Sequence, residues 1–187
     1  MRVILISGKA QHGKDTTASI IRDALEADRY KVLIAHYGDL VKYVCSTFFG
    51  WNGEKDDAGR TLLQYVGTDV VRAKRQDYWV EFITGILELF NEEWDYVLIP
   101  DCRFPNEIDC MKNAGIDATH VRVVRQNFTS PLTEEQQKHP SETALDNTIP
   151  DAYINNCGTI DDLRITISKW LTELNGFHQL SFGEIEG

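Results

Sequence analysis

Residues 7–18 read SGKAQHGKDTTA, and they combine two glycines, two lysines and three hydroxyl side chains. Gly8, Gly13 and Lys14 have the spacing G-x-x-x-x-G-K of a phosphate-binding loop, in which glycine lets the main chain approach an anion closely. Backbone N–H groups and the dipole of a following helix then converge on the phosphates, while the lysine adds a mobile positive charge. The stretch therefore predicts a binding site for phosphate groups.

Asp15 stands where this motif usually has a serine or threonine, and hydroxyls follow only at Thr16 and Thr17. A carboxylate is repelled by phosphate oxygens unless a cation lies between them, and Mg²⁺ prefers oxygen ligands and keeps several waters. We therefore expect Asp15 to contact Mg²⁺ directly or through water, and the two threonines to hold phosphate oxygens. The alternative is that Asp15 only favours the start of a helix.

A second group of chemically useful side chains follows the apolar run of YVLIPDCRF, residues 96–104. Catalytic groups of open α/β sheets gather at the carboxyl ends of strands. There Asp101 could orient the shell of Mg²⁺, and Arg103 could clamp a phosphate through two hydrogen bonds. The alternative is a strand-end turn in which the aspartate and the arginine serve only structure.

Three further positions are candidates on weaker grounds. Arg125 comes at the end of a predicted strand, where it could reach phosphate or stack on a base. Arg72 could meet the phosphate of an acceptor, although most such arginines lie at the surface. His139, in KHPSETAL, is a lone histidine and is more often solvated or packed than catalytic.

Two aromatic side chains, Tyr78 and Trp79, could stack on a nucleobase. Their spacing with Phe82 is that of one helix face, however, so core packing is an equally good interpretation.

The elements that must position these residues alternate between short apolar runs and helical patterns. Strands are expected at 3–6, 31–37, 96–101, 118–125 and 152–156. Helices are expected at 15–27, 39–49, 60–75 with a break or bend near Gly67, 77–90, 105–115 and 159–174. A loop is expected at 50–59, and a capping box of Thr133 and Gln136 predicts the start of a short helix. This alternation predicts an α/β fold, a five-stranded mostly parallel sheet with helices on both faces.

Composition limits the kinds of partner. The chain has 187 residues, 42% of them hydrophobic, which suits one domain over 1–187. The formal net charge of −10 argues against a nucleic-acid surface, and neither a membrane span nor a signal peptide is expected. The four cysteines form no metal-binding spacing and are expected to be reduced thiols, which favours the cytoplasm. The stretch 177–187 is expected to be a mobile tail.

The motifs SGKAQHGKDTTA, LLQYVGTDVVR, DYWV, YVLIPDCRFPNEID, AGIDATHVRVVR and INNCGTIDDL occur in this order along the chain. In this they resemble the bacteriophage-type deoxynucleoside monophosphate kinases, a family within the P-loop nucleoside monophosphate kinase superfamily. The resemblance runs from residue 3 to about 174. The G-K-D-T-T loop and the P-D-x-R strand end are its distinctive parts.

The resemblance implies a P-loop kinase with CORE, NMP-binding and LID regions, working with ATP and Mg²⁺. The acceptor would bind in the insert 39–93, through residues such as Arg72, and 126–140 would be the LID, with Arg125 at its root. Lys14 would hold the β and γ phosphates. Donor adenine would lie near Asn155, Gly158 and Thr159.

The function predicted from these observations is transfer of the γ-phosphoryl group of ATP to a (deoxy)nucleoside monophosphate. Lys14, Arg103, Arg125 and Mg²⁺ would neutralise the transferring group, with Asp101 helping to hold the metal. Two alternatives stay open: a kinase of another phosphorylated acceptor, such as dephospho-coenzyme A or phosphomevalonate, and a non-catalytic nucleotide-binding module. Partners would be small nucleotides, and a homodimer is a possible assembly.

Overall fold

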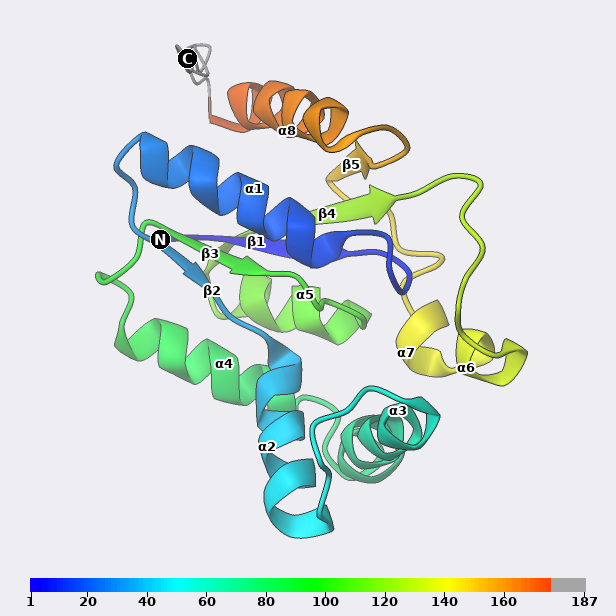
Figure 1. The fold of residues 1–187 in the computed structure, drawn as a ribbon. Coiled ribbons are helices and arrows are strands. Elements are labelled where there is room, and N and C mark those ends of the chain that lie inside the picture. Colours follow the sequence, from blue (N-terminus) through cyan, green and yellow to red (C-terminus); the bar gives the residue numbers. More distant parts are fainter. Residues whose placement is uncertain (176–187) are drawn as a thin grey trace.

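The computed structural model describes residues 1–175 and places five strands in one parallel sheet (Figure 1). The sheet order is β2-β3-β1-β4-β5. The strands are β1 (Arg2–Ser7), β2 (Val32–Ile34), β3 (Tyr96–Ile99), β4 (Asp117–Val124) and β5 (Ala152–Asn155). Every pairing is parallel, which confirms the predicted α/β fold and makes the sheet wholly parallel over the described residues.

Strand β1 is central and buried on both sides. Ile4 and Ile6 point into one apolar cluster, and Val3 and Leu5 into another, as the alternation of side chains along a strand requires. Its continuous apolar sequence is what a buried parallel strand needs. The loop that follows Ser7 therefore starts from one of the most firmly packed points of the molecule.

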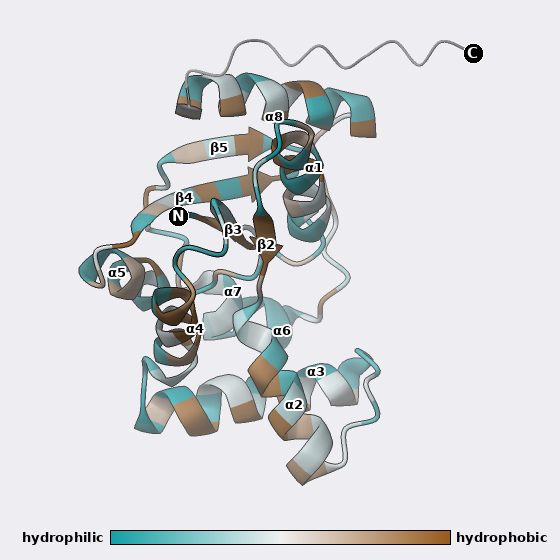
Figure 2. Ribbon diagram, turned by 90° about the vertical axis from the view of Figure 1, so that its left-hand side faces the viewer, coloured by the Kyte–Doolittle hydropathy of each residue, from teal (hydrophilic) through white to brown (hydrophobic). Residues whose placement is uncertain are grey.

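Helices cover both faces of the sheet, as predicted (Figure 1). The first cluster lies against α1 (Lys14–Ala27) and α8 (Ile160–Asn175), and the second against α4 (Tyr78–Leu89) and α5 (Pro105–Asn113). Figure 2 shows β2 and α4 among the most hydrophobic elements. Among the described residues, no helix combines the length and the apolar character that crossing a membrane requires.

The insert between β2 and β3 differs from prediction in three places. Helix α2 (Tyr37–Phe49) begins at a residue that was expected to belong to the strand. Helix α3 (Asp57–Gln64) begins inside the expected loop, where the Asp56 side chain accepts a hydrogen bond from the N–H of Gly59. No break occurs at Gly67, because the helix continues as the π-helix η1 (Tyr65–Arg72).

Two short helices lie between β4 and β5, beyond the carboxyl ends of the strands (Figure 1). In α6 (Glu134–Lys138) the predicted capping box is present, with Thr133 and Gln136 bonded to each other's backbone. Helix α7 (Pro140–Thr143) was not predicted. The expected tail at 177–187 lies outside the described residues.

A buried Ser7–His120 pair lies directly under the loop that follows β1. The Ser7 Oγ and His120 Nε2 atoms are 2.7 Å apart, and His120 Nδ1 has no hydrogen-bond partner within residues 1–175. Burial, followed by the charge of Arg122, lowers the pKa of His120 to about 4 from an ordinary value of 6.5. The folded protein therefore holds this imidazole neutral at neutral pH.

This pair gives a pH dependence of stability. The His120 contribution is complete above pH 6.5, decreases as the unfolded chain takes up a proton below that pH, and levels off below pH about 4. The loss corresponds to about 3 kcal/mol of unfolding free energy. Urea unfolding of the wild type and of His120→Gln between pH 7 and 4 measures it. Parallel pH profiles for the two proteins would contradict the assignment.

Candidate functional site

The loop between β1 and α1 has the geometry of a phosphate-binding loop. Gly8 has φ +144°, and a Cβ there would lie 2.5 Å from the carbonyl oxygen of Val123. Gly13 has φ +92° and caps α1, and a Cβ there would lie 2.4 Å from Asn156 Nδ2. The Asn156 side chain also donates to His12 O at 2.9 Å. Glycine is thus required at both positions, and β4 and the residue after β5 hold the loop in place.

Lys14 begins α1 and is folded back over the loop. Its Nζ donates to Gly8 O at 2.8 Å and to Lys9 O at 3.0 Å. Burial, and then the positive charge of Arg103, lower the pKa of this ammonium to about 8. Two cations held close together with little water around them form a site that an anion would stabilise.

Asp15 is exposed on the first turn of α1 and faces His36, which the sequence analysis did not select. The His36 Nε2 and Asp15 Oδ1 atoms are 3.5 Å apart, and His36 Nδ1 lies 3.5 Å from Asp39 Oδ2. The contact with Asp15 raises the pKa of His36, and the same contact lowers the pKa of Asp15. Its position at the sheet edge, directly after the apolar run of β2, was the available signal for this histidine.

A cavity of about 400 Å³ opens beside the loop. It is lined by Gln11, Gly13, Lys14, Asp15, Thr16, Arg125, Asn156, Ile160 and Leu163. Its phosphate-loop end is polar, and α8 supplies two aliphatic side chains at another part of the wall. A long anion with a flat apolar end fits such a lining.

Several residues that were predicted to bind the phosphate donor, ATP, do not line this cavity. Thr17 is fully buried, and its hydroxyl has no partner among residues 1–175. Asn155 is exposed, and it is the next residue, Asn156, that lines the cavity. Gly158 lies against Asp162, and Thr159 is bonded to the Asp162 carboxylate at the start of α8, so these two residues form a helix cap.

Asp101 follows β3 and holds the start of α2. Its Oδ1 accepts from the N–H of Tyr37 at 3.1 Å, and its Oδ2 accepts from the N–H of Gly38 at 2.8 Å. Each oxygen keeps a second lone pair, so a water of a Mg²⁺ shell is still compatible with this arrangement. Residues 1–175 contain no cluster of three or more acidic, histidine or cysteine side chains suited to a metal. Mg²⁺ here would depend on phosphates and water for its remaining ligands, and exposed Asp15 fits that requirement.

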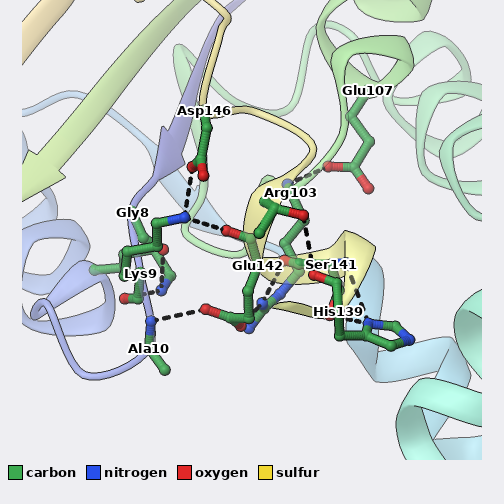
Figure 3. A network of polar contacts seen from close by, with 11 residues as sticks. Gly8, Lys9, Ala10, Arg103, Glu107, His139, Ser141, Glu142 and Asp146 are labelled. Carbon is green, nitrogen blue, oxygen red and sulfur yellow. Dashed lines mark hydrogen bonds and ion pairs between the residues drawn. The ribbon is translucent and has the colours of Figure 1, made fainter. Parts of the chain in front are cut away.

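Arg103, two residues after Asp101, is joined to α7 and the loop by Glu142 (Figure 3). The guanidinium Nη1 donates to Ser141 O at 2.8 Å and to a carboxylate oxygen of Glu142. The other carboxylate oxygen of Glu142 accepts from the N–H of Ala10 in the phosphate loop at 3.1 Å. The arginine predicted from the strand end therefore does lie beside the loop, and Glu142 is the residue that the sequence analysis missed.

Arg72 ends η1 in a buried ion pair with Glu107, the second carboxylate that was missed. Its guanidinium carbon lies 4.0 Å from the centre of the Phe104 ring. Glu107 also accepts from the backbone N–H of Arg103 at 2.6 Å and of Phe104 at 3.1 Å. One buried carboxylate thus joins Arg72 to the segment that carries Arg103.

Trp79 belongs to the core. It is 2% exposed, packs in the cluster of Val41, Cys45 and Val66, and donates from Nε1 to Gly67 O at 2.9 Å. Its ring is covered by protein, so of the two aromatic interpretations the structure favours packing. Tyr78 beside it is 39% exposed and keeps a free surface.

Sequence comparison gives one family. The family model for deoxynucleotide monophosphate kinases matches residues 41–167, which is more than half of the chain. The deoxynucleotide monophosphate kinase of Enterobacteria phage T4 is 33% identical over 117 residues, covering 62% of this chain and 46% of that protein. The kinase of the same name from Escherichia phage RB69 is 32% identical over 114 residues, covering 60% of this chain and 44% of that protein. The matched stretch thus spans less than half of each curated relative.

Structural comparison gives the fold. The Mycobacterium tuberculosis APS kinase CysC, solved with AMPPNP and APS, superposes with a TM-score of 0.52 at 14% identity, covering 91% of this chain and 96% of that one. An unliganded sugar kinase from Janibacter sp. HTCC2649 gives a TM-score of 0.53 at 12% identity, covering 91% and 94%. At such identities the likeness shows a shared P-loop kinase fold.

Proposed function

Because the chain belongs to the deoxynucleotide monophosphate kinase family, we propose that it transfers the γ-phosphoryl group of ATP to a deoxynucleoside monophosphate, giving the diphosphate and ADP. The observation that carries the proposal is the meeting of the phosphate loop and Arg103 at the carboxyl edge of the sheet. The family match begins at residue 41, so the loop supports a kinase independently of it.

ATP would bind in the cavity beside α1. The loop N–H groups and Lys14 would hold its phosphates together with Thr16, and Arg125 and Asn156 would line the path to the base. Ile160 and Leu163 offer an apolar wall for adenine, close to where Asn155, Gly158 and Thr159 were expected to hold it. The guanidinium carbon of Arg125 lies 4.8 Å from the centre of the Phe128 ring, and Arg125 directly precedes the proposed LID, residues 126–140.

The acceptor would bind on the other side of Arg103, against the insert 39–93. Arg72 supports this placement because Glu107 ties it to the segment carrying Arg103. Tyr78, at the start of α4, has an exposed side chain that could meet a base, whereas Trp79 would act only through packing. Arg103 would lie between donor and acceptor, where negative charge develops during transfer.

The chemistry requires little from protein side chains beyond position and charge. The acceptor phosphate is already ionised, so no general base is assigned, and in-line placement with charge neutralisation supplies the rate. Mg²⁺ would be held by Asp15, with Asp101 touching its water shell, and it would neutralise charge on the phosphate oxygens.

Asp15→Ala tests the metal assignment. We expect the Mg²⁺ concentration for half-maximal activity to rise about 10-fold, because one oxygen contact to the metal or its water is lost. Asp39→Asn is the matched control, since Asp39 also contacts His36 but lies on α2. A Mg²⁺ dependence that is the same in the wild type and in Asp15→Ala would remove the metal role.

A screen of acceptors tests the function itself. The four deoxynucleoside monophosphates, dephospho-coenzyme A and phosphomevalonate are offered with ATP and Mg²⁺, and release of ADP is measured. A kinase of the proposed type releases ADP with one or more of the four nucleotides and very little without an acceptor. Turnover with only the other two acceptors identifies a different kinase. Nucleotide binding without any transfer identifies a non-catalytic module.

A further inference from the structure

The segment 139–142, of sequence HPSE, lies against two separate parts of the molecule (Figure 3). His139 Nε2 lies 3.5 Å from Asp69 Oδ1 on η1, and His139 Nδ1 accepts from the N–H of Ser141 at 3.2 Å. At its other end, Glu142 meets the phosphate loop and Arg103. The segment therefore touches the proposed acceptor insert and the proposed donor site at once.

The Glu142 side chain is almost completely buried, with 6% of its surface exposed. A buried carboxylate is costly unless both oxygens have partners, and here each has one: Arg103 Nη1 and the N–H of Ala10. A single rigid group thus fixes the distance between a strand-end arginine and the phosphate loop. Neither partner is adjacent to Glu142 in the chain.

The contacts of Arg103 are confined to one edge of its guanidinium. Ser141 O and the Glu142 carboxylate both accept hydrogen bonds from Nη1 of Arg103. Its Nε and Nη2 atoms have no hydrogen-bond partner among residues 1–175. About a third of the side chain, 34%, is exposed. The edge formed by Nε and Nη2 is a fork that can donate two parallel hydrogen bonds to a phosphate. Glu142 thus binds Arg103 through Nη1 and leaves the Nε and Nη2 groups available to a phosphate.

We propose that Glu142 is a positioning residue, which holds Arg103 against the phosphate loop so that its Nε–Nη2 edge meets the transferring phosphoryl group. The proposal rests on the proposed function and goes beyond it by naming what aligns the arginine. In the HPSE segment, Glu142 is then the residue that acts on Arg103. His139 accepts a hydrogen bond from the N–H of Ser141 and so orders the turn that carries Glu142.

The matched control lies four residues further on. Asp146 is paired with Lys9 Nζ at 2.5 Å, so it too fastens the segment after α7 to the phosphate loop. It makes no contact with Arg103, and its side chain is 50% exposed. Removing the Asp146–Lys9 pair weakens the contact between the segment after α7 and the phosphate loop but leaves the Glu142–Arg103 contact in place. It therefore tests whether a slower transfer reaction requires the loss of the contact to the arginine.

The experiment compares kcat, KM and melting temperature in six proteins: wild type, Glu142→Gln, Glu142→Asp, Arg103→Met, the double variant Glu142→Gln/Arg103→Met and the control Asp146→Asn. We expect Glu142→Gln to lower kcat about 10- to 100-fold, with a much smaller change in the KM for ATP, because a misaligned group affects the transition state most. Glu142→Asp keeps the charge but is one methylene too short to span both partners, so it should also lose rate. Asp146→Asn should change kcat by no more than about 2-fold.

The double variant separates a positioning role from general support of the fold. If Glu142 acts through Arg103, adding Glu142→Gln to Arg103→Met should cost little further rate. Additive losses, or a kcat in both Glu142 variants close to the wild type, would overturn the proposal while the kinase function stands. Tighter ATP binding and faster turnover in Glu142→Gln would also overturn it, because the carboxylate would then be competing with phosphate. A wild-type protein without any transfer activity would overturn both.

Discussion

Lys14→Ala is expected to lower phosphoryl transfer about 1,000-fold, the largest effect on rate that we predict. Within residues 1–175 the ammonium bonds only to two loop carbonyls, Gly8 O and Lys9 O. Both groups belong to the loop itself, so the ammonium is free to move onto a phosphate when one arrives. Removing it leaves the loop N–H groups but takes away the charge that can follow the γ-phosphoryl group.

The measurement is kcat and kcat/KM for the acceptor that the screen identifies, with melting temperature as the test of folding. Lys112→Ala is the control, since this lysine is half exposed on α5 and its pair with Asp151 is long, at 3.9 Å. The control should retain the wild-type rate. Near-normal turnover in Lys14→Ala would contradict the assignment of the phosphate loop.

Gly8→Ala is expected to have the largest effect on stability and to weaken nucleotide binding with it. The new Cβ would lie 2.5 Å from Val123 O, a backbone atom of β4, and φ at this position is +144°. Because a strand carbonyl in the middle of a sheet cannot swing aside, the loop must move. Strain and overpacking together correspond to a loss of about 3 kcal/mol in unfolding free energy.

Urea unfolding measures the loss, and binding of a non-hydrolysable ATP analogue measures the damage to the site. Gly85→Ala on α4 is the matched control, because a Cβ there meets nothing within 4 Å. Alanine in a helix interior should stabilise the control by about 1 kcal/mol. Equal stability of the two alanine variants would show that the loop is not held against β4 as described.

The sequence predicted the parts of the site whose signals are local. The phosphate loop, the strand end with Arg103 and the parallel sheet all follow from short motifs and apolar runs. The sheet is confirmed, and the structure places the loop and Arg103 beside each other at its carboxyl edge. The prediction that Asp15 meets a metal stays a prediction. Asn155 was selected from the sequence, whereas the structure places Asn156 in the cavity wall, because neighbouring residues at a strand end point to opposite faces.

What the sequence could not predict depends on contacts between distant segments. Glu107 and Glu142 act on residues 35 and 39 positions away in the chain. The π-helix η1 was read as a break at Gly67, since its hydrogen bonding has no distinct hydrophobic period and glycine usually weakens a helix. Here Gly67 instead lets Val41 approach closely: a Cβ would lie 3.2 Å from a methyl group of that residue.

The two hydrogen bonds between Asp101 and the start of α2 have a consequence for the rest of that helix. Both carboxylate oxygens accept hydrogen bonds from the first turn of α2, so this end of the helix is fixed to the carboxyl edge of the sheet. The helix has 13 residues and is therefore about 20 Å long, and Val41 and Cys45 in its middle pack in the cluster that also holds Trp79. The other end of the helix carries Phe48 and Phe49, whose side chains are exposed. Substitutions at that exposed end can therefore alter the outer part of the insert while the contact of Asp101 with α2, beside Arg103, is kept.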